Sequence, residues 1–192
     1  MTEYFKPVPF PLWKEDKLAF ADALGRSFRE TGFAVISEHP VSQSVIDANL
    51  KATKDFFALP EEVKLKYDGR EGGGQRGYTA FGVENAKGKA EADQKEFWHT
   101  GRALPADSPY RETMADTPSV PEVPDFDAAT RGMYDALDGF GRQLLRAVAL
   151  HLKLEETWFD NKVDVGNSIL RLLHSPPQTN PPPEGSVRAG AH

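Results

Sequence analysis

The spacing of apolar residues predicts two amphipathic helices in the first third of the chain. One covers residues 15–31 and ends at Gly32, and the other runs from an N-cap at Ser42 to residue 59, just before Pro60. In both stretches apolar residues recur three or four positions apart, which places them on one face of a helix. The predicted inward positions are Leu18, Phe20, Ala21, Leu24, Phe28, Ile46, Leu50, Thr53 and Phe57.

A third and longer helix is predicted over residues 125–152, with a shorter one over residues 155–161. Glycines at 132, 139 and 141 lie inside the long helix, where each costs up to about 1 kcal/mol relative to alanine. We therefore expect another backbone to pack closely against them. The apolar stripe of this helix consists of Phe126, Thr130, Met133, Leu137, Phe140, Leu144 and Val148.

Strand signals are short and scattered. Residues 8–10 predict an extended piece, residues 33–36 a buried strand, residues 95–99 a short strand, and residues 169–173 an apolar strand that enters a proline-rich loop. Residues 67–90 and 103–124 are predicted to be irregular. Helices with isolated strands come first and strands gather only at the end, which favours an α+β protein whose main sheet lies mostly past residue 192.

Composition narrows the classes of partner and site. The chain has 192 residues, no cysteine and a net charge of −6, so disulfides, thiolate zinc sites and iron–sulfur clusters are excluded. Without a basic stripe, nucleic acid and anionic membranes are poor partners. No apolar run approaches the roughly 20 residues that span a bilayer, and no signal peptide is present, so the cytoplasm is the expected location.

One glycine motif has a nucleotide-binding spacing but the wrong surroundings. Residues 72–77, GGGQRG, match the G-x-G-x-x-G pattern of dinucleotide-binding proteins. That fingerprint needs a buried strand before it and a helix after it, so that the phosphate meets a helix N-terminus. Here the preceding segment is polar and the following one does not begin a helix. The motif is therefore interpreted as a loop.

Five histidines are candidates for metal or proton chemistry. His39 precedes a proline at a turn and His151 lies near the end of the long helix, so both are interpreted as structural. His99, beside two aromatic residues, either lines a pocket or lies at a sheet edge, and His174 alternates with leucine on a strand. His192 alone means little, and its interest comes from the residues around it.

Six segments follow one another along nearly the whole chain: TGFAVISEH (31–39), DFFALP (55–60), RGY (76–78), DQKEFW (93–98), LRLLHSPP (170–177) and RAGAH (188–192). Together, in this order, they resemble the isopenicillin N synthase-like branch of the iron(II)/2-oxoglutarate-dependent dioxygenases. The resemblance implies an α/β N-terminal region that leads into a double-stranded β-helix, or jelly-roll, catalytic core. Residues 1–120 would be the N-terminal dioxygenase region, and residues 121–192 the long helix and the first core strands.

The resemblance also implies a metal and a cosubstrate. His192 would be the first iron(II) ligand, followed in the family by an aspartate or glutamate two residues later and by a second histidine further on. Such a triad leaves positions open on the iron, which 2-oxoglutarate and dioxygen occupy. The expected activity is hydroxylation, desaturation or cyclisation of a small organic substrate. The chain looks like the N-terminal portion of a longer protein, and without the later ligands we expect it to be inactive.

The same resemblance suggests substrate contacts and leaves alternatives open. Arg76 and Tyr78 lie on a segment that approaches the substrate pocket in relatives, although both could equally anchor a loop. Ser175 replaces a tyrosine that many members carry before the proline pair. This difference keeps open an oxidase that does not use 2-oxoglutarate, and a chain that naturally ended here would be a non-catalytic binding module. Expressed alone, it should be aggregation-prone, because its long helix would lack a sheet to pack on.

Overall fold

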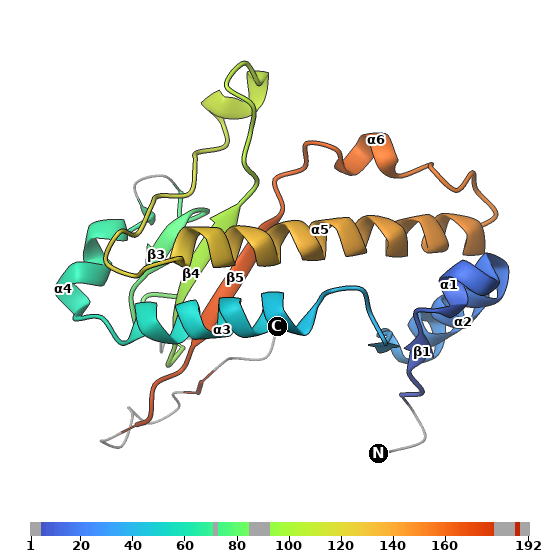
Figure 1. Cartoon of the computed structure of the whole chain (residues 1–192), viewed down its shortest axis with the longest axis horizontal. Coiled ribbons are helices and arrows are strands. Elements are labelled where there is room, and N and C mark those ends of the chain that lie inside the picture. The colour runs from blue at the N-terminus through green and yellow to red at the C-terminus, as the bar shows by residue number, and fades with distance from the viewer. Residues whose placement is uncertain (1–4, 71–72, 85–92, 179–186, 189–192) are drawn as a thin grey trace. The chain divides into compact units, whose positions relative to one another are not determined.

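A computed structural model describes residues 5–70, 73–84, 93–178 and 187–188 (Figure 1). The fold divides into two compact units, each assembled from separate stretches of sequence. Unit 1 combines residues 1–46 with 135–166, and unit 2 combines residues 47–134 with 167–192. The sequence-based division at residue 120 stays a prediction.

Unit 1 is built around helix α2 (Lys17–Thr31) and the C-terminal part of the long helix α5 (Phe126–His151). It also contains α1 (Leu12–Glu15), α6 (Asp160–Val163) and two short parallel strands, β1 (Val8–Pro9) and β2 (Ile36–Ser37). Its core brings α2 against the apolar stripe of α5. The buried residues of this core are Val8, Phe10, Trp13, Phe20, Ala21, Leu24 and Ala147.

Both ends of α2 are fixed by helix-capping residues, Asp16 at the start and Gly32 at the end. Gly32 adopts a left-handed conformation with φ of 78° and ends the helix as predicted. The helix begins later than predicted, at Lys17, because the Asp16 side chain accepts a 2.9 Å hydrogen bond from the backbone N–H of Ala19. The inward face is also narrower than predicted, since Leu18 is 68% exposed.

The prediction of a buried strand over residues 33–36 was wrong. Phe33 is 69% exposed and Val35 is 45% exposed, and only Ile36–Ser37 forms β2. Among the described residues this strand pairs with β1 alone, so its apolar neighbours lie beside a two-stranded ribbon rather than inside a larger sheet. An apolar run identifies a candidate strand but not what covers it.

Unit 2 holds a three-stranded antiparallel sheet in the order β3-β4-β5. The strands are β3 (Gly77–Thr79), β4 (Glu96–Gly101) and β5 (Ile169–His174). Strands β4 and β5 confirm the predicted strands near these positions, whereas β3 lies in a segment predicted to be irregular. The helical elements are α3 (Gln43–Phe57), which begins in unit 1, then α4 (Glu61–Lys64) and the 3-10 turns η1 (Leu65–Tyr67) and η3 (Pro109–Glu112).

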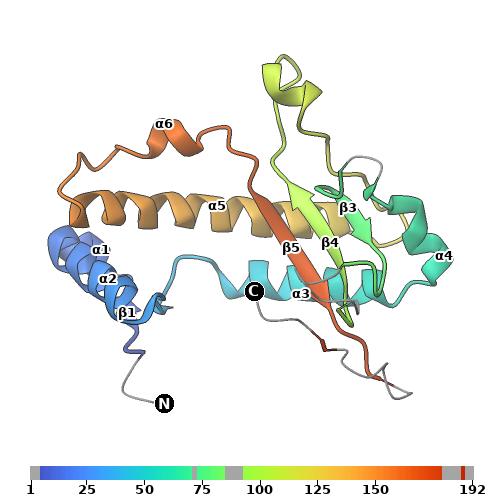
Figure 2. The same cartoon turned by 180° about the vertical axis from the view of Figure 1, so that it is seen from behind.

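Helix α3 and the first turns of α5 cover one face of this sheet, and Figure 2 looks onto the other face, which no described helix covers. Aromatic rings fill the covered side. Phe56 packs against Trp98 with ring centroids 4.9 Å apart and against Phe126 at 5.0 Å. The buried core residues are Ala52, Phe56, Phe57, Tyr78, Ala80, Trp98, Val120, Val123, Phe126 and Leu172.

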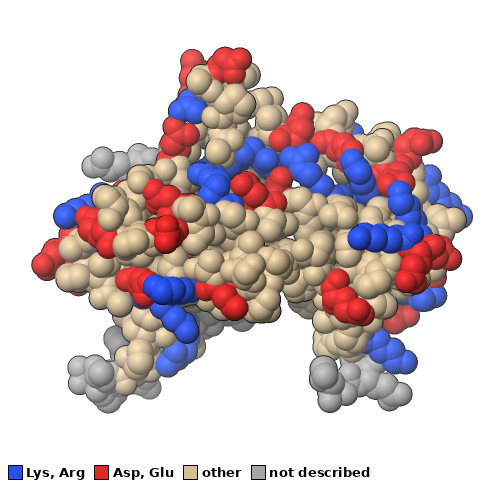
Figure 3. Space-filling view, in the orientation of Figure 1, with Lys and Arg blue, Asp and Glu red and all other residues tan. Residues whose placement is uncertain are grey.

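The glycines of α5 do not mark a close backbone contact, contrary to the prediction. A Cβ atom built at Gly132, Gly139 or Gly141 meets no described atom within 4 Å. The nearby surface is charged instead: in unit 1, Arg142 pairs with Asp138 and Arg146 with Asp160. Figure 3 shows basic and acidic side chains side by side along α5. Among the described residues, no helix is long and apolar enough to cross a membrane.

Candidate functional site

The register of the sheet sorts its side chains onto two faces. Residues directly opposite one another in an antiparallel pair share a face, and successive residues alternate. Tyr78, Trp98 and Leu172 form the row that points into the core. The neighbouring rows, Thr79–Phe97–Leu173 and Gly77–His99–Arg171, lie on the other face, which we call the open face.

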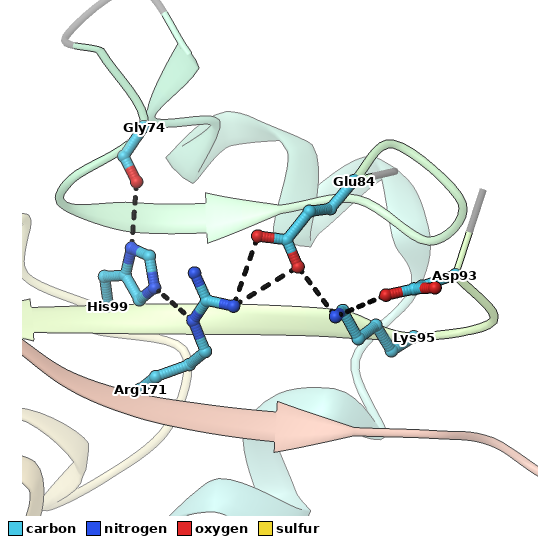
Figure 4. Close-up of polar contacts among 6 residues, drawn as sticks. All are labelled: Gly74, Glu84, Asp93, Lys95, His99 and Arg171. Atoms are coloured by element: carbon cyan, nitrogen blue, oxygen red, sulfur yellow. Dashed lines mark hydrogen bonds and ion pairs between the residues drawn. The ribbon is translucent and has the colours of Figure 1, made fainter. Parts of the chain in front are cut away.

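A chain of polar contacts crosses the open face (Figure 4). Arg171 donates from Nε to His99 Nε2 at 2.8 Å, and its Nη1 contacts both carboxylate oxygens of Glu84 at 3.2 Å. The guanidinium also lies over the Phe97 ring, with Cζ 4.2 Å from the ring centroid. Strand register places Arg171 and His99 opposite each other, so the sheet itself fixes this pair.

The contacts of His99 determine its tautomer. Its Nδ1 lies 2.8 Å from the carbonyl oxygen of Gly74, which can only accept, so Nδ1 carries the proton. Nε2 is then free to accept from Arg171. Burial lowers the pKa of His99 most, the bond to Gly74 raises it by less than burial lowers it, and the positive charge of Arg171 lowers it again. The ring is therefore neutral at neutral pH.

Glu84 and Lys95 extend the chain of contacts toward Asp93. Lys95 Nζ lies 2.8 Å from Glu84 and 2.7 Å from Asp93, and its side chain is 6% exposed. Burial alone would raise the pKa of Glu84, but Lys95 and Arg171 outweigh burial and lower it. Glu84 is therefore ionised between its two basic neighbours.

A second polar cluster lies on the core side, at one end of the sheet. Glu96, whose side chain is 5% exposed, accepts from Lys64 at 2.8 Å, from the Tyr78 hydroxyl, and from His174 Nδ1 at 2.8 Å. The His174 ring also stacks on Phe57, with centroids 5.0 Å apart. The cluster ties β3, β4 and β5 to α3 and α4 beside the point where β5 enters the loop at Ser175.

The predicted substrate contacts fall in three different environments. Tyr78 is 1% exposed and its hydroxyl donates to Glu96, so burial raises its pKa and the side chain serves the core. Arg76 is 6% exposed; it donates to Asn167 Oδ1 and the Gln75 carbonyl oxygen at 2.7 Å each, and its Nε is buried without a partner. Ser175 follows β5, and its carbonyl oxygen lies 3.4 Å from Arg188 Nη1. The structure thus does not bring these three side chains together.

Two contacts place the described end of the chain beside the sheet. The backbone N–H of Gln94, just before β4, donates to the Val187 carbonyl oxygen at 2.9 Å, and Arg188 contacts Ser175. The predicted ligand His192 lies outside the described residues. Within the described ranges, no group of three or more His, Cys, Asp or Glu side chains could hold a metal ion.

Comparison with known proteins identifies the family. Residues 9–123 match the family described as non-haem dioxygenase in morphine synthesis N-terminal, which is more than half of the 192 residues. The chain belongs to this non-haem dioxygenase family. The matched region includes α2, α3, β3 and β4, and so contains two strands of the open face.

Curated relatives of the chain carry related descriptions. A 2-oxoglutarate-dependent dioxygenase, htyE of Aspergillus rugulosus, is 30% identical over 190 residues, covering 93% of this chain and 56% of the relative. A proline hydroxylase, buaE of Petromyces alliaceus, is 32% identical over 163 residues, covering 82% and 50% of the two chains. The chain therefore spans about half the length of the curated relatives it matches.

Solved structures resemble the chain over nearly its full length. A Caulobacter crescentus protein, described as a putative 2OG-Fe(II) oxygenase family protein, has 47% identity and a TM-score of 0.89, covering 100% of this chain and 61% of its own. A Neurospora crassa protein crystallised at full length in complex with alpha-KG has 28% identity and a TM-score of 0.79, covering 98% and 60%. These neighbours are jelly-roll oxygenases, and with the mixed helices and antiparallel strands they confirm the expected α+β class.

Sequence reasoning did not assemble the open-face network. His99 was considered only as a residue that lines a pocket or lies at an edge, and neither Arg171 nor Glu84 was assigned a role. The sequence held one usable signal. Phe97 and His99 are two positions apart on one strand, and Arg171 and Leu173 are two positions apart on another, so on each strand an apolar and a polar residue share a face. The register between β4 and β5 could not be predicted from the sequence of either strand alone.

Proposed function

We propose that this chain is part of a mononuclear non-haem iron(II), 2-oxoglutarate-dependent oxygenase that oxidises a small organic molecule with dioxygen. The observation that carries the proposal is the family match over residues 9–123, because it contains two of the three strands that build the open face. Relatives described as 2-oxoglutarate-dependent, and a neighbour crystallised with alpha-KG, support the same cosubstrate and the same metal.

The described residues do not form an iron site, so we assign them other tasks in this enzyme. We propose that the open face of the sheet forms one wall of the substrate pocket, with its charged side chains held in place by the network of Figure 4. His192 as the first iron ligand stays a prediction. When bound, iron and 2-oxoglutarate would supply the oxidising chemistry, and the sheet would position the substrate.

The descriptions of related proteins support a small polar molecule as the substrate. One relative is described as a proline hydroxylase, and the Neurospora crassa neighbour was also crystallised with thymine, so related proteins handle small polar molecules. Arg76 is buried and its Nε faces Gly101, so its contact with the substrate also stays a prediction. Substrate contacts at Tyr78 and Ser175, a cytoplasmic location and the absence of nucleic-acid partners stay predictions.

The complete protein provides the direct test. Its sequence after His192 should contain an aspartate or glutamate two residues on and a histidine further along. Purified enzyme should convert 2-oxoglutarate to succinate only with iron(II), and His192→Ala should abolish this conversion. His39→Ala is the matched control, because His39 is an exposed histidine outside the helices and strands. Dioxygen uptake without succinate would favour an oxidase, and no iron-dependent turnover at all would contradict both enzyme proposals.

A further inference from the structure

Arg171 is held in a fixed position although it lies on the open face. Its Nε bonds to His99 at 2.8 Å, its plane covers the Phe97 ring at 4.2 Å, and its Nη1 contacts Glu84 at 3.2 Å. When an exposed arginine binds a ligand, rotation about several of its side-chain bonds is restricted, which costs conformational entropy. Here the fold has already restricted that freedom, so a ligand would meet a prepared guanidinium.

The donors of Arg171 are only partly used. A guanidinium has five N–H groups in a planar fork. The one on Nε goes to His99, and Nη1 serves Glu84, but within the described part of the chain Nη2 makes no hydrogen bond. The Arg171 side chain is 40% exposed, so a ligand can approach it from the open face.

Glu84 is a weak competitor for the same edge of the guanidinium. Its two oxygens are 3.2 Å from Arg171 Nη1, longer than the roughly 2.7–2.9 Å of a strong charge-assisted bond. The same carboxylate is closer to Lys95, at 2.8 Å. Glu84 can therefore keep its partner Lys95 while a second carboxylate takes the outer edge of Arg171.

We propose that Arg171 binds a carboxylate group of the substrate through its Nη1–Nη2 edge, and that His99 is the positioning residue that holds the guanidinium in place. The planar fork matches a carboxylate in two parallel hydrogen bonds. This inference rests on the proposed function, because it places the substrate on the open face of the same site. It deepens that function by assigning the substrate class: small molecules that carry a carboxylate.

His99 can position Arg171 only while its ring is neutral. In that state Nε2 accepts from Arg171, whereas a protonated ring would point an N–H at the guanidinium. The charged groups acting on the ring are Arg171 on β5, Arg76 before β3 and Glu84 on the loop after β3. The two arginines lower the pKa of His99 and Glu84 raises it, and burial, which also lowers it, is the largest influence. Carboxylate binding should therefore weaken only in acid, as His99 gains its proton.

The binding test uses two probes that differ in charge but hardly in shape, phenylacetate and phenylacetamide. Each is titrated into the ¹⁵N-labelled complete protein, and the Arg171 side-chain Nε–H signal and the backbone signals of β4 and β5 are followed by NMR. We expect phenylacetate to shift these signals with an affinity at least ten-fold above that of phenylacetamide. Equal affinities for the two probes would overturn the proposal.

Substitutions assign the effect to named residues. Arg171→Gln should reduce phenylacetate affinity at least ten-fold, and Arg171→Lys should reduce it several-fold, because lysine keeps the charge but loses the fork. Arg26→Gln on α2 removes the same charge from an exposed pair with Asp22 and should change affinity less than two-fold. Unchanged binding in a folded Arg171→Gln variant, as judged by circular dichroism, would contradict the role of Arg171.

The role of His99 has its own readout. A glutamine places an acceptor near the position of Nε2, so His99→Gln should retain much of the affinity, whereas His99→Ala should lose several-fold. In the wild type, phenylacetate affinity should fall in acid more steeply than titration of the probe itself predicts, and His99→Gln should remove this excess. The same pH profile in both proteins would reduce His99 to a packing residue.

These measurements need neither iron nor 2-oxoglutarate, so they can fail independently of the proposed function. If the complete protein shows no iron-dependent succinate release but Arg171 still selects phenylacetate, the oxygenase proposal fails and the carboxylate site stands. If the enzyme is active and Arg171→Gln leaves kcat/KM unchanged on its best substrate, the oxygenase stands and the carboxylate site is overturned.

Discussion

Gly101 lies directly against the guanidinium of Arg76. A Cβ atom at residue 101 would be 1.8 Å from Arg76 Nε and 1.9 Å from Cζ, well inside van der Waals contact. The glycine cannot easily move away, because its carbonyl oxygen accepts from Arg131 at 2.6 Å and its N–H donates to Thr117 at 3.0 Å. The absence of a side chain at the end of β4 is therefore what allows an arginine to be buried there.

Gly101→Ala should displace Arg76 and destabilise the chain. Overpacking of a buried site typically costs about 1–3 kcal/mol, and displacement would also break the 2.7 Å bond from Arg76 to Asn167. The free energy of unfolding from urea titration measures the loss. Arg76→Ala in the Gly101→Ala background should recover part of it, because the clash disappears. Additive losses in the double variant would contradict the contact.

Alanine at the glycines of α5 should have the opposite effect. Gly132, Gly139 and Gly141 have open space where a Cβ would lie, and none has a positive φ. Each Gly→Ala change should raise the free energy of unfolding by about 0.5–1 kcal/mol, because alanine loses less conformational freedom in a helix. Gly132→Ala thus also serves as the matched control for Gly101→Ala. A destabilised Gly132→Ala variant would mean that some other group approaches this face of α5.

Alanine substitutions at Gly77 and Gly32 should distinguish the conformational strain of a positive φ from the free-energy cost of a backbone clash. Both have positive φ, of 79° and 78°, but a Cβ at Gly77 would be 2.4 Å from the Tyr67 carbonyl oxygen, whereas Gly32 has no neighbour within 4 Å. Gly32→Ala should cost only the conformational strain, about 1–2 kcal/mol. Gly77→Ala adds a backbone clash and should cost clearly more by thermal or urea unfolding. Equal losses would show that the η1 backbone can move away.

The exposed apolar residues of unit 1 should make the isolated chain associate. Phe33 and Val35 are 69% and 45% exposed beside β2. Phe33→Ser should slow light-scattering growth at raised temperature while leaving the unfolding midpoint nearly unchanged, because little burial is lost. Phe20→Ser is the contrasting control, since Phe20 is fully buried and its loss should lower the midpoint. Unchanged aggregation in Phe33→Ser would place the association surface elsewhere.

The parts of this fold that were predictable from sequence depend on neighbours along the chain. The end of α2 at Gly32, the α3 cap at Ser42 and the span of α5 follow from local periodicity and capping. Strand β3 was missed because Gly77 lies in a glycine-rich segment, where propensity argues against a strand. It forms because β4 offers a partner with a buried face.

In the candidate site, too, features set by neighbouring residues were predictable and features set by distant contacts were not. The family resemblance was confirmed, and it rested on short motifs of contiguous residues, which can be recognised without knowing the fold. The contact between His99 and Arg171 joins residues 72 positions apart and depends on the strand register, which no local pattern reveals. The same holds for Tyr78, whose hydroxyl reaches Glu96 only because β3 and β4 pair as they do.

The buried pair of Lys64 and Glu96 should dominate the acid sensitivity of unit 2. Their side chains are 9% and 5% exposed and lie 2.8 Å apart. Burial alone would raise the pKa of Glu96, but hydrogen bonds from Lys64, Tyr78 and His174 outweigh it and lower the pKa below its usual value. Because the folded-state pKa is the lower one, this stability is fully present above the unfolded-state pKa, near 4.5, and is lost as pH falls through the folded-state value.

Glu96→Gln should therefore destabilise the chain at neutral pH and flatten its pH dependence in acid. The amide leaves Lys64 buried without a charged partner, a change that typically costs about 3–5 kcal/mol. Urea titrations from about pH 7 down to about pH 3 would show a large gap between the two proteins that narrows as Glu96 becomes protonated in the wild type. Adding Lys64→Met should restore much of the stability at neutral pH, because it removes the uncompensated charge. A gap that stays constant with pH would contradict an ionised Glu96 in the folded state.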